Sequence, residues 1–303
     1  MRAVRYERFG GPEVLEVVEV DEPEVRPGTV RIRVAAAGIN PADRKRREGA
    51  FAGGRPLAAP ATPGFEAAGT VDAVGDGVTG VEPGDEVFGF GQGTWAEVAV
   101  LDVWAPRPEA MPVLEAAATP VPVETALRAL DAVRVGEGDT VVISGAAGGV
   151  GTAAIQLARA RGAIVIGTAS EANQEYLEAL GALATTYDTG WPDRVRDLAV
   201  AEVDAALDLA GAGVIPELVA LTGDAGRVVS IADFSAGDHG AQVTGSTGDR
   251  AAALAVAAAG YEDGSLRMIV EREYPLDEAV QAQEDGRAGH ARGRSVLLVG
   301  ARP

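Results

Sequence analysis

The sequence predicts an α/β protein with two domains, one mostly of β structure and one built on a doubly wound parallel sheet. Its 303 residues are enough for two domains of ordinary size. Residues 1–100 are short β-like runs broken by Gly and Pro. From about residue 112, apolar strands alternate with helical segments, the pattern of βαβ units. We therefore expect residues 116–249 to form the parallel-sheet domain, and residues 1–115 and 250–303 to join in the other domain.

The N-terminal strands are expected between turn signals such as Arg26-Pro27-Gly28 and Glu82-Pro83-Gly84-Asp85. These strands are residues 3–6, 14–20, 29–36, 69–74, 86–88 and 95–100. In the middle we expect helical segments over 114–130 around a Pro break, strands 140–144, 163–168, 204–209 and 227–231, and helices 150–160 and 173–180. The C-terminal part predicts a helix over 250–261, a strand over 268–274, a helix from Leu276 and a strand over 295–299.

The composition excludes several classes of function. A formal net charge of −19 opposes binding to nucleic acid or to an anionic membrane, because both need basic surfaces. Cysteine is absent, which excludes disulfides, thiolate metal ligands and cysteine nucleophiles, and His239 and His290 are too few for a His-rich zinc site. The start of the chain lacks the apolar segment of a signal peptide, and no uninterrupted apolar run is long enough to span a membrane. We expect a cytoplasmic protein.

The residues Ser144 to Gly151, SGAAGGVG, carry the clearest chemistry. They lie between a predicted strand and a predicted helix, and Ala146, Gly148 and Gly151 match a dinucleotide fingerprint with Ala at its first Gly position. Such a turn brings backbone N–H groups and a helix N-terminus to a pyrophosphate without an intervening side chain. A purely structural turn is the alternative, but a second predicted strand about 20 residues later favours nucleotide binding.

The end of that second strand bears on the choice of nucleotide. NAD-binding chains usually place an acidic residue there for the ribose 2′-hydroxyl. Here Thr168-Ala169-Ser170 comes first and Glu171 follows. Ser170 can donate to a 2′-phosphate, whereas an inward-pointing Glu171 would repel it. The sequence favours NADPH, with NADH as the alternative.

Five segments together resemble the zinc-independent medium-chain dehydrogenases/reductases of the quinone oxidoreductase type, over essentially the whole chain. They are AAAGINPADRKRREG (35–49), TPGFEAAGTVDAVGDGVTGVEPGDEVFGF (62–90), AAATPVPVETALRAL (116–130), GDTVVISGAAGGVGTAAIQLARARGA (138–163) and GHARGRSVLLV (289–299). The resemblance implies a GroES-like catalytic domain formed by both chain ends, a Rossmann domain, and an active site in the cleft between them.

The resemblance also implies roles for individual residues. Asn40 matches an Asn beside the nicotinamide and substrate, and Asp43 matches its nearby Asp. The positions that match cofactor contacts are Thr125 near the phosphates; Gly148, Gly149, Val150 and Gly151 in the pyrophosphate turn; Ser170, Asn173 and Tyr187 at the adenosine end; and Ala210, Gly211, Ile231 and Ala232 in loops along the nicotinamide.

Three departures from the family pattern stand out. Ala172 replaces a basic residue often found in the 2′-phosphate pocket, which weakens the preference for NADPH. Arg44 stands where relatives frequently have an aromatic residue. The Cys and His of zinc-binding relatives are missing, since the second position reads Gly64-Phe65-Glu66, so we expect no catalytic metal.

The implied reaction is hydride transfer to an electron-poor C=C bond or a quinone, which needs a donor for the developing oxyanion and a source of protons. Asn40 is the candidate orienting donor, and Lys45, Arg44 or solvent is the candidate proton source. The run Arg44 to Arg47 is read first as a solvated helix face and alternatively as an attractant for an anionic substrate. Phe51, Phe65, Phe90 and Trp95 are candidates for a planar apolar pocket, with core packing expected for at least two of them.

The leading hypothesis is therefore an NADPH-dependent reductase of quinones or conjugated carbonyl compounds. One alternative is a redox-neutral cyclase or isomerase on the same scaffold, and another is a nucleotide-sensing protein without catalysis. A homodimer is expected from the resemblance.

Overall fold

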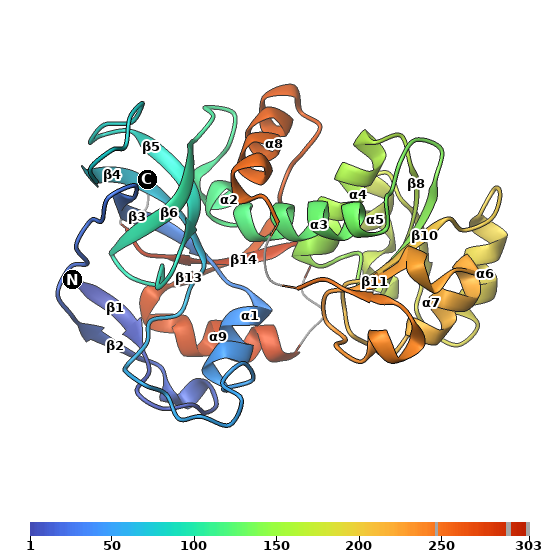
Figure 1. Cartoon of the computed structure of the whole chain (residues 1–303), viewed down its shortest axis with the longest axis horizontal. Helices are drawn as coiled ribbons and strands as arrows, with labels where there is room; N and C mark the ends of the chain where they lie inside the picture. The colour runs from blue at the N-terminus through green and yellow to red at the C-terminus, as the bar shows by residue number, and fades with distance from the viewer. Residues whose placement is uncertain (246–247, 289–291, 301–303) are drawn as a thin grey trace. The chain divides into compact units, whose positions relative to one another are not determined.

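The structure is a computed structural model that describes residues 1–245, 248–288 and 292–300. Its chain divides into two compact units. The β-rich unit comprises Met1–Val121, Arg250–Glu262 and Val270–Pro303, and the parallel-sheet unit comprises Pro122–Asp249 and Asp263–Ile269. The blue and red ends of the chain both contribute to the β-rich unit (Figure 1). As domain boundaries, 115/116 and 249/250 stay a prediction.

The β-rich unit is organised around strand β3. Its strands are β1 (Arg2–Arg5), β2 (Glu16–Glu19), β3 (Val30–Gly38), β4 (Glu66–Val74), β5 (Glu86–Gly91), β6 (Val98–Pro106), β13 (Val270–Pro275) and β14 (Arg294–Leu298). The sheet order is β13-β14-β3-β4-β5-β6, and because β6 also pairs with β3, the four strands β3 to β6 close on themselves. Strands β1 and β2 form a separate antiparallel pair. The helices are α1 (Pro41–Arg47), α2 (Val113–Ala117), α8 (Arg250–Asp263) and α9 (Ala279–Ala288).

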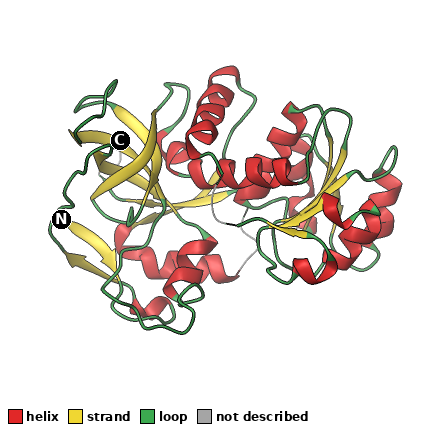
Figure 2. Cartoon of the chain, viewed as in Figure 1, coloured by secondary structure: helices red, strands yellow, loops and turns green. Residues whose placement is uncertain are grey.

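The parallel-sheet unit is doubly wound. Its strands are β7 (Thr140–Ser144), β8 (Ile164–Ala169), β9 (Leu183–Thr186), β10 (Ala205–Asp208), β11 (Val228–Ser230) and β12 (Gln242–Val243), and its helices are α3 (Pro120–Ala132), α4 (Gly149–Ala160), α5 (Gln174–Ala179), α6 (Trp191–Leu198) and α7 (Ile215–Thr222). The order β12-β11-β10-β7-β8-β9 reverses direction at β7. Helices lie on either side of this sheet, drawn red beside the yellow strands in Figure 2. Ligands of such sheets bind where the order reverses, at the carboxyl ends of the strands.

Each unit has its own hydrophobic core. In the β-rich unit the core includes Val4, Ile32, Val71, Trp95, Leu101 and Leu297. In the parallel-sheet unit it includes Val142, Ile166, Val195, Ala206, Leu218 and Val228. Small and β-branched residues fill the parallel strands, as expected where both faces of a sheet are buried.

The fold class predicted from the sequence is confirmed, and so are all the expected strands and helices, with shifted ends. The largest shift is in β6, expected at 95–100 and observed at Val98–Pro106. The structure adds β9, β12, α6 and α7, which the sequence did not predict. His290 lies outside the described residues, as does the start of the segment 289–299.

Candidate active site

The Gly-rich turn after β7 leads into α4, whose first backbone N–H groups have no carbonyl partner within the helix. Gly145 has a φ of +77°, which Gly adopts without strain. The Thr152 N–H donates to the Gly148 carbonyl at 2.8 Å and makes the bond that closes the first helical turn. The N–H groups of residues 149–151 precede that bond and therefore have no carbonyl partner within the helix. These donors, at the positive end of α4, suit an anionic group.

Gly148 provides the open space that such an anion needs. Its φ of −74° and ψ of 174° are accessible to any residue. A Cβ atom placed on Gly148 would have the Gly145 carbonyl oxygen as its nearest neighbour, at 3.5 Å. Neither the backbone conformation nor the neighbouring atoms of the protein therefore require glycine at this position. The open space beside Gly148 fits a dinucleotide pyrophosphate.

Gly151 has a different reason to be glycine. A Cβ atom here would lie 2.3 Å from the carbonyl oxygen of buried Ala146 and 2.5 Å from its carbonyl carbon. Gly151 therefore lets α4 pack closely on the turn, whereas Gly148 keeps the space outside the turn free.

A buried hydrogen-bond network sets the loops after β10 and β11. Asp208 accepts the N–H groups of Ala210 and Gly211 on Oδ1, at 3.2 and 2.9 Å. Its Oδ2 accepts the Ser230 hydroxyl at 2.7 Å. The Ser230 Oγ in turn accepts the N–H of Ala232 at 3.1 Å. Sequence analysis missed Asp208 and Ser230, although a polar residue at the end of each apolar strand was a usable signal.

The structure brings three of the predicted cofactor loops together. A Cβ on Gly145 would lie 3.0 Å from the Cβ of Ala210, so the phosphate turn adjoins the loop after β10. A Cβ on Gly211 would lie 3.0 Å from the Cβ of Ala232, so that loop adjoins the one after β11. The Ile231 N–H donates to the carbonyl of Asp208, at the end of β10, at 3.1 Å, so Ile231 also lies beside this strand end. These contacts lie at the carboxyl edge of the sheet, where its strand order reverses.

The predicted adenosine end lies at the carboxyl ends of β8 and β9. The Asn173 Nδ2 donates to the Ser170 Oγ at 3.2 Å. Ala169 pairs with Thr186, so Ser170 and Tyr187 follow neighbouring strand ends. The Tyr187 side chain is 53% exposed.

A guanidinium also lies at this edge, on α6. Arg194 donates to the Thr186 carbonyl at 3.1 Å and pairs with Asp188. Sequence analysis did not single it out, because α6 itself was not predicted. Thr125, on α3, is buried, and its hydroxyl donates to Glu124 at 3.3 Å.

In the β-rich unit, Asn40 and Asp43 form a compact site at the start of α1. Both side chains are buried. The Asp43 carboxylate accepts the Asn40 N–H on Oδ2 and the Gly64 N–H on Oδ1, each at 2.8 Å. The carboxylate therefore fixes the start of α1 against the segment that enters β4.

The Asn40 side chain is held by a second buried carboxylate that sequence analysis considered only as a remnant of a metal motif. Its Nδ2 donates to Glu66 Oε1 at 2.7 Å. The same Oε1 accepts from the Arg294 guanidinium, and Oε2 accepts the Val121 N–H at 2.7 Å. Arg294 also donates from Nε to the Ala118 carbonyl at 3.1 Å. Glu66 and Arg294 are 228 residues apart in the chain, so the pairing was not visible in the sequence.

Burial dominates the ionisation of both carboxyl groups. It raises the pKa of Asp43 to about 7, while the N–H groups of Asn40 and Gly64 act in the opposite direction. The Glu66 carboxylate raises the pKa of Asp43 further and the Arg294 guanidinium lowers it. Burial also raises the pKa of Glu66, against the lowering effect of Arg294 and of its hydrogen-bond donors. The Arg294 guanidinium bonds directly to Glu66 and acts on Asp43 only through space, so the ionised form is favoured at Glu66 and a proton is retained more readily on Asp43.

The raised pKa of Asp43 predicts an unusual pH dependence of stability. A carboxyl whose pKa is higher in the folded state stabilises the fold below its unfolded pKa and loses that contribution as pH rises through the folded value. The free energy of unfolding of the wild type, relative to Asp43→Asn, should therefore fall between about pH 4 and about pH 7. Urea titrations of both proteins across this range measure the difference, and a difference that does not change with pH contradicts the raised pKa.

The basic run on α1 is solvated only in part, and the first interpretation is wrong at Arg47. Arg47 is 1% exposed and donates to the Gly10 carbonyl and, at 3.2 Å, to Gln283. Arg46 is exposed, but its guanidinium lies over the Phe65 ring at 5.3 Å from the centroid. Arg44 and Lys45 are half-buried. Burial was missed for Arg47 because hydrophobic periodicity cannot identify a helix whose inward positions are charged.

The four candidate aromatic residues do not form one pocket. Phe90 and Trp95 are core residues, and Trp95 donates from Nε1 to the Gly38 carbonyl at 3.1 Å. Phe65 is partly buried, and Phe51 is 57% exposed. The expectation of core packing for two of them is confirmed.

Comparison with known proteins assigns the family. Profiles described as "Alcohol dehydrogenase GroES-like domain" and "Zinc-binding dehydrogenase" match residues 26–108 and 149–261. A quinone oxidoreductase of Mus musculus is 34% identical over 99% of this chain and 98% of its own length. The chain belongs to the medium-chain dehydrogenase/reductase superfamily and is of the quinone oxidoreductase type. It is thus an NAD(P)H-dependent oxidoreductase.

Two further relatives extend the comparison within this superfamily. A 2-methylene-furan-3-one reductase of Solanum lycopersicum is 32% identical over 98% of this chain and 79% of its own length. A mycobacterial protein solved in complex with NADPH has a TM-score of 0.86 at 28% identity, covering 98% of this chain and 99% of the other.

One of the two matching profiles is named for zinc binding, which makes clusters of acidic and histidine side chains relevant. Within residues 1–245, 248–288 and 292–300, no three His, Asp or Glu side chains come together in a way that could hold a metal ion. None of the helices described there is both long and apolar enough to cross a membrane.

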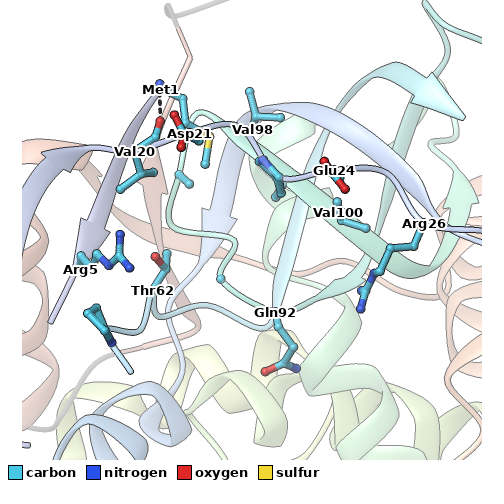
Figure 3. Close-up of a pocket in the computed structure, with 15 residues that line it drawn as sticks. Met1, Arg5, Val20, Asp21, Glu24, Arg26, Thr62, Gln92, Val98 and Val100 are labelled. Carbon is cyan, nitrogen blue, oxygen red and sulfur yellow. Dashed lines mark hydrogen bonds between the residues drawn. The ribbon is translucent and has the colours of Figure 1, made fainter. Parts of the chain in front are cut away.

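A surface hollow of this oxidoreductase is lined by none of the predicted site residues. It has a volume of about 450 Å³ and lies within the β-rich unit. Figure 3 shows side chains from the connection between β2 and β3, including Asp21 and Glu24, facing Val98 and Val100 of β6. Charges of both signs and small apolar side chains line it, and it carries no functional assignment.

Proposed function

We propose that this oxidoreductase transfers hydride from NADPH to a quinone or to the C=C bond of a small conjugated carbonyl compound, without a metal. The observation that carries the proposal is the turn at residues 145–151, where Gly148 leaves space beside the unpartnered N–H groups of α4. The named activities of the mouse and tomato relatives support the substrate class.

The proposed cofactor contacts lie in the parallel-sheet unit. Gly148, Gly149, Val150 and Gly151 would hold the pyrophosphate, and Ala210, Gly211, Ile231 and Ala232 would line the nicotinamide, with Thr125 and Ala146 supporting the phosphates. Ser170, Asn173 and Tyr187 would hold the adenosine end. NADPH is proposed over NADH because Ser170 and Asn173 offer donors, and because the Arg194 guanidinium lies at this edge, where it pairs with Asp188, whereas Ala172 offers no donor. The mycobacterial relative bound to NADPH supports this choice.

In the proposed reaction the β-rich unit acts on the substrate. When bound, the reduced nicotinamide supplies the hydride. Hydride addition to the β-carbon or to the quinone moves an electron pair to the carbonyl oxygen, and that oxygen needs a donor in the transition state. Asn40 has one amide N–H engaged by Glu66, and its second N–H would donate to the substrate oxygen. Asp43 would keep Asn40 in place through the Asn40 backbone.

The half-buried cations Arg44 and Lys45 are proposed to stabilise the developing negative charge. Lys45 would deliver the proton that completes the reduction, and solvent would then restore it. Their positions on α1 follow directly after Asp43, so the same short helix would carry the orienting, stabilising and proton-donating groups.

Turnover measurements test the proposal. Reduced nicotinamide absorbance should decrease when NADPH is mixed with the protein and a panel of simple quinones and enones, and NADH should serve less well. Silence across the panel with both cofactors contradicts the reductase assignment. Thermal stabilisation by NADPH without turnover would instead indicate the redox-neutral or nucleotide-sensing alternative. A homodimer and a cytoplasmic location stay predictions.

A further inference from the structure

The carboxamide of Asn40 is held in one orientation by a buried carboxylate. Glu66 is fully buried, and its Oε1 accepts the Asn40 Nδ2 at 2.7 Å. A carboxylate that receives donors can only accept, so Asn40 must turn its NH₂ group toward Glu66 and its Oδ1 away. With the opposite orientation two oxygens would face each other in a buried setting, which is strongly unfavourable.

Glu66 is in turn fixed by donors on both of its oxygens. Arg294 donates to Oε1 and the Val121 N–H donates to Oε2 at 2.7 Å. The carboxylate also occupies the space above Gly38 at the end of β3, where a Cβ would lie 2.3 Å from Oε1. The position of the Glu66 side chain is therefore determined by β3, by the start of α3 and by β14, and not by Asn40 itself.

We propose that Glu66, held by Arg294, is a positioning residue that orients the Asn40 amide so that its second N–H donates to the substrate oxygen. This inference rests on the proposed function, because it takes Asn40 as the residue that meets the substrate. Glu66 itself touches no substrate. Its contribution is to remove the alternative amide orientation, so that the donor is already aligned when negative charge develops on the oxygen.

Glu66→Gln is the variant that tests the proposal directly. It preserves the side-chain volume but replaces one acceptor oxygen by an NH₂ group. The single Gln oxygen can face either the Val121 N–H or the Asn40 and Arg294 donors, and its NH₂ group then opposes the donors on the other side. The side chain can no longer satisfy both sides at once, so the amide of Asn40 loses its single fixed orientation. The expected result is a decrease in kcat on the order of 10- to 100-fold, below the loss typical for removing an oxyanion donor altogether. KM for NADPH should be unchanged, because the cofactor contacts lie in the other unit.

A double-mutant cycle separates positioning from general structural damage. If Glu66 acts through Asn40, Glu66→Gln should lower kcat in the wild type but have no further effect in Asn40→Ala. The proposal is overturned if the fold-decreases in kcat of the two single variants multiply in the double variant. A Glu66→Gln variant with wild-type kcat also overturns it. Asp72→Asn is the matched control. Asp72 lies on β4, as Glu66 does, and the substitution removes the charge from a partly buried ion pair with Arg31 of β3, at 2.9 Å, so kcat should be unchanged.

Two further measurements keep the proposal testable if Glu66→Gln does not fold. Arg294→Lys retains the charge but loses the planar guanidinium that holds Glu66, and the same cycle with Asn40→Ala applies to it. Amide NMR of the cofactor-free protein provides a readout independent of turnover. The side-chain NH₂ signals of Asn40 can be assigned because they are absent from the spectrum of Asn40→Ala. One of these two amide protons should be shifted downfield and protected from exchange with solvent.

Loss of that protection in Arg294→Lys supports the proposal, and two equivalent, rapidly exchanging protons in the wild type overturn it. If the wild type shows the protected proton but reduces no quinone or enone, the proposed function has failed while the orientation of Asn40 stands. If the wild type is active and the cycle is multiplicative, the positioning role alone has failed.

Discussion

A Gly148→Ala variant is expected to keep the wild-type fold and to lose the stabilisation that NADPH confers. In the structure an added Cβ at this position has only the Gly145 carbonyl oxygen near it, at 3.5 Å, an ordinary van der Waals distance. The backbone angles of Gly148 are also accessible to alanine. The protein alone therefore gives no reason for glycine here, whereas a pyrophosphate bound at the proposed site would.

The expected effect is large because the methyl group would occupy the space through which a phosphate approaches the N–H groups of residues 149–151. A ligand present at a hundredfold excess over its Kd stabilises a protein by about 2.7 kcal/mol. Thermal denaturation with and without NADPH should show that stabilisation in the wild type and lose it in Gly148→Ala. The melting temperature without cofactor should change little.

Two other glycines provide the controls. Gly136→Ala has nothing within 4 Å of the added Cβ and should retain both the fold and the response to NADPH. Gly151→Ala places its methyl 2.3 Å from the Ala146 carbonyl oxygen, so it should destabilise the protein even without cofactor. An undiminished NADPH response in Gly148→Ala would place the pyrophosphate elsewhere.

The parts of the fold that the sequence predicted are those with local signals. The strand Thr140–Ser144, the glycine turn and the helix Gly149–Ala160 follow from an apolar run, from conformational demands of glycine and from helical periodicity. Strand β9, Leu183–Thr186, was missed because its sequence LATT lacks alternation and its first residue is exposed at the edge of the sheet. Helix α6 had a weaker signal, with Trp191, Val195 and Leu198 at helical spacing within a mostly polar segment.

The candidate site also has one part that the sequence predicted and one part that it did not. The proposed phosphate-binding turn is contiguous in sequence, so the spacing of its glycines could be recognised. The residues around Asn40 are not contiguous in sequence. Glu66 and Arg294 come into contact only because β4 and β14 both lie beside β3. Helix α1 shows the limit of patterning most clearly: its buried positions are Asp43 and Arg47, both charged, and a method that searches for apolar residues reads that helix as solvent-exposed.

The second large effect is expected at Arg294. Replacing it by Met keeps much of the apolar volume of the side chain but leaves the carboxylate of Glu66 buried without its cation. Breaking a buried ion pair by removing one partner typically costs about 3–5 kcal/mol, because the remaining charge is uncompensated. The Ala118 carbonyl also loses its donor. We expect Arg294→Met to lower the free energy of unfolding by an amount in this range at neutral pH.

The pH dependence of that loss identifies its cause. Removing the guanidinium takes away the interaction that lowers the pKa of Glu66, so burial raises that pKa further in the variant. A carboxyl with a raised folded pKa stabilises the fold in acid and loses the contribution as pH rises through that pKa. The deficit of Arg294→Met relative to the wild type should therefore grow from acid toward alkaline pH. Urea denaturation at several pH values measures it.

Two comparisons decide whether the buried charge is responsible. Glu66→Gln combined with Arg294→Met removes both charges and should recover part of the lost stability, with a weaker pH dependence than Arg294→Met alone. Arg196→Met breaks an exposed pair with Asp193 on α6 and should change stability little, since such pairs contribute little in water. If Arg294→Met is as stable as the wild type at every pH, Glu66 is not held as a buried anion. The ion pair between Arg294 and Glu66 is proposed both to stabilise the β-rich unit and to orient the Asn40 amide. Without a buried Glu66 anion, a single orientation of that amide is not expected either.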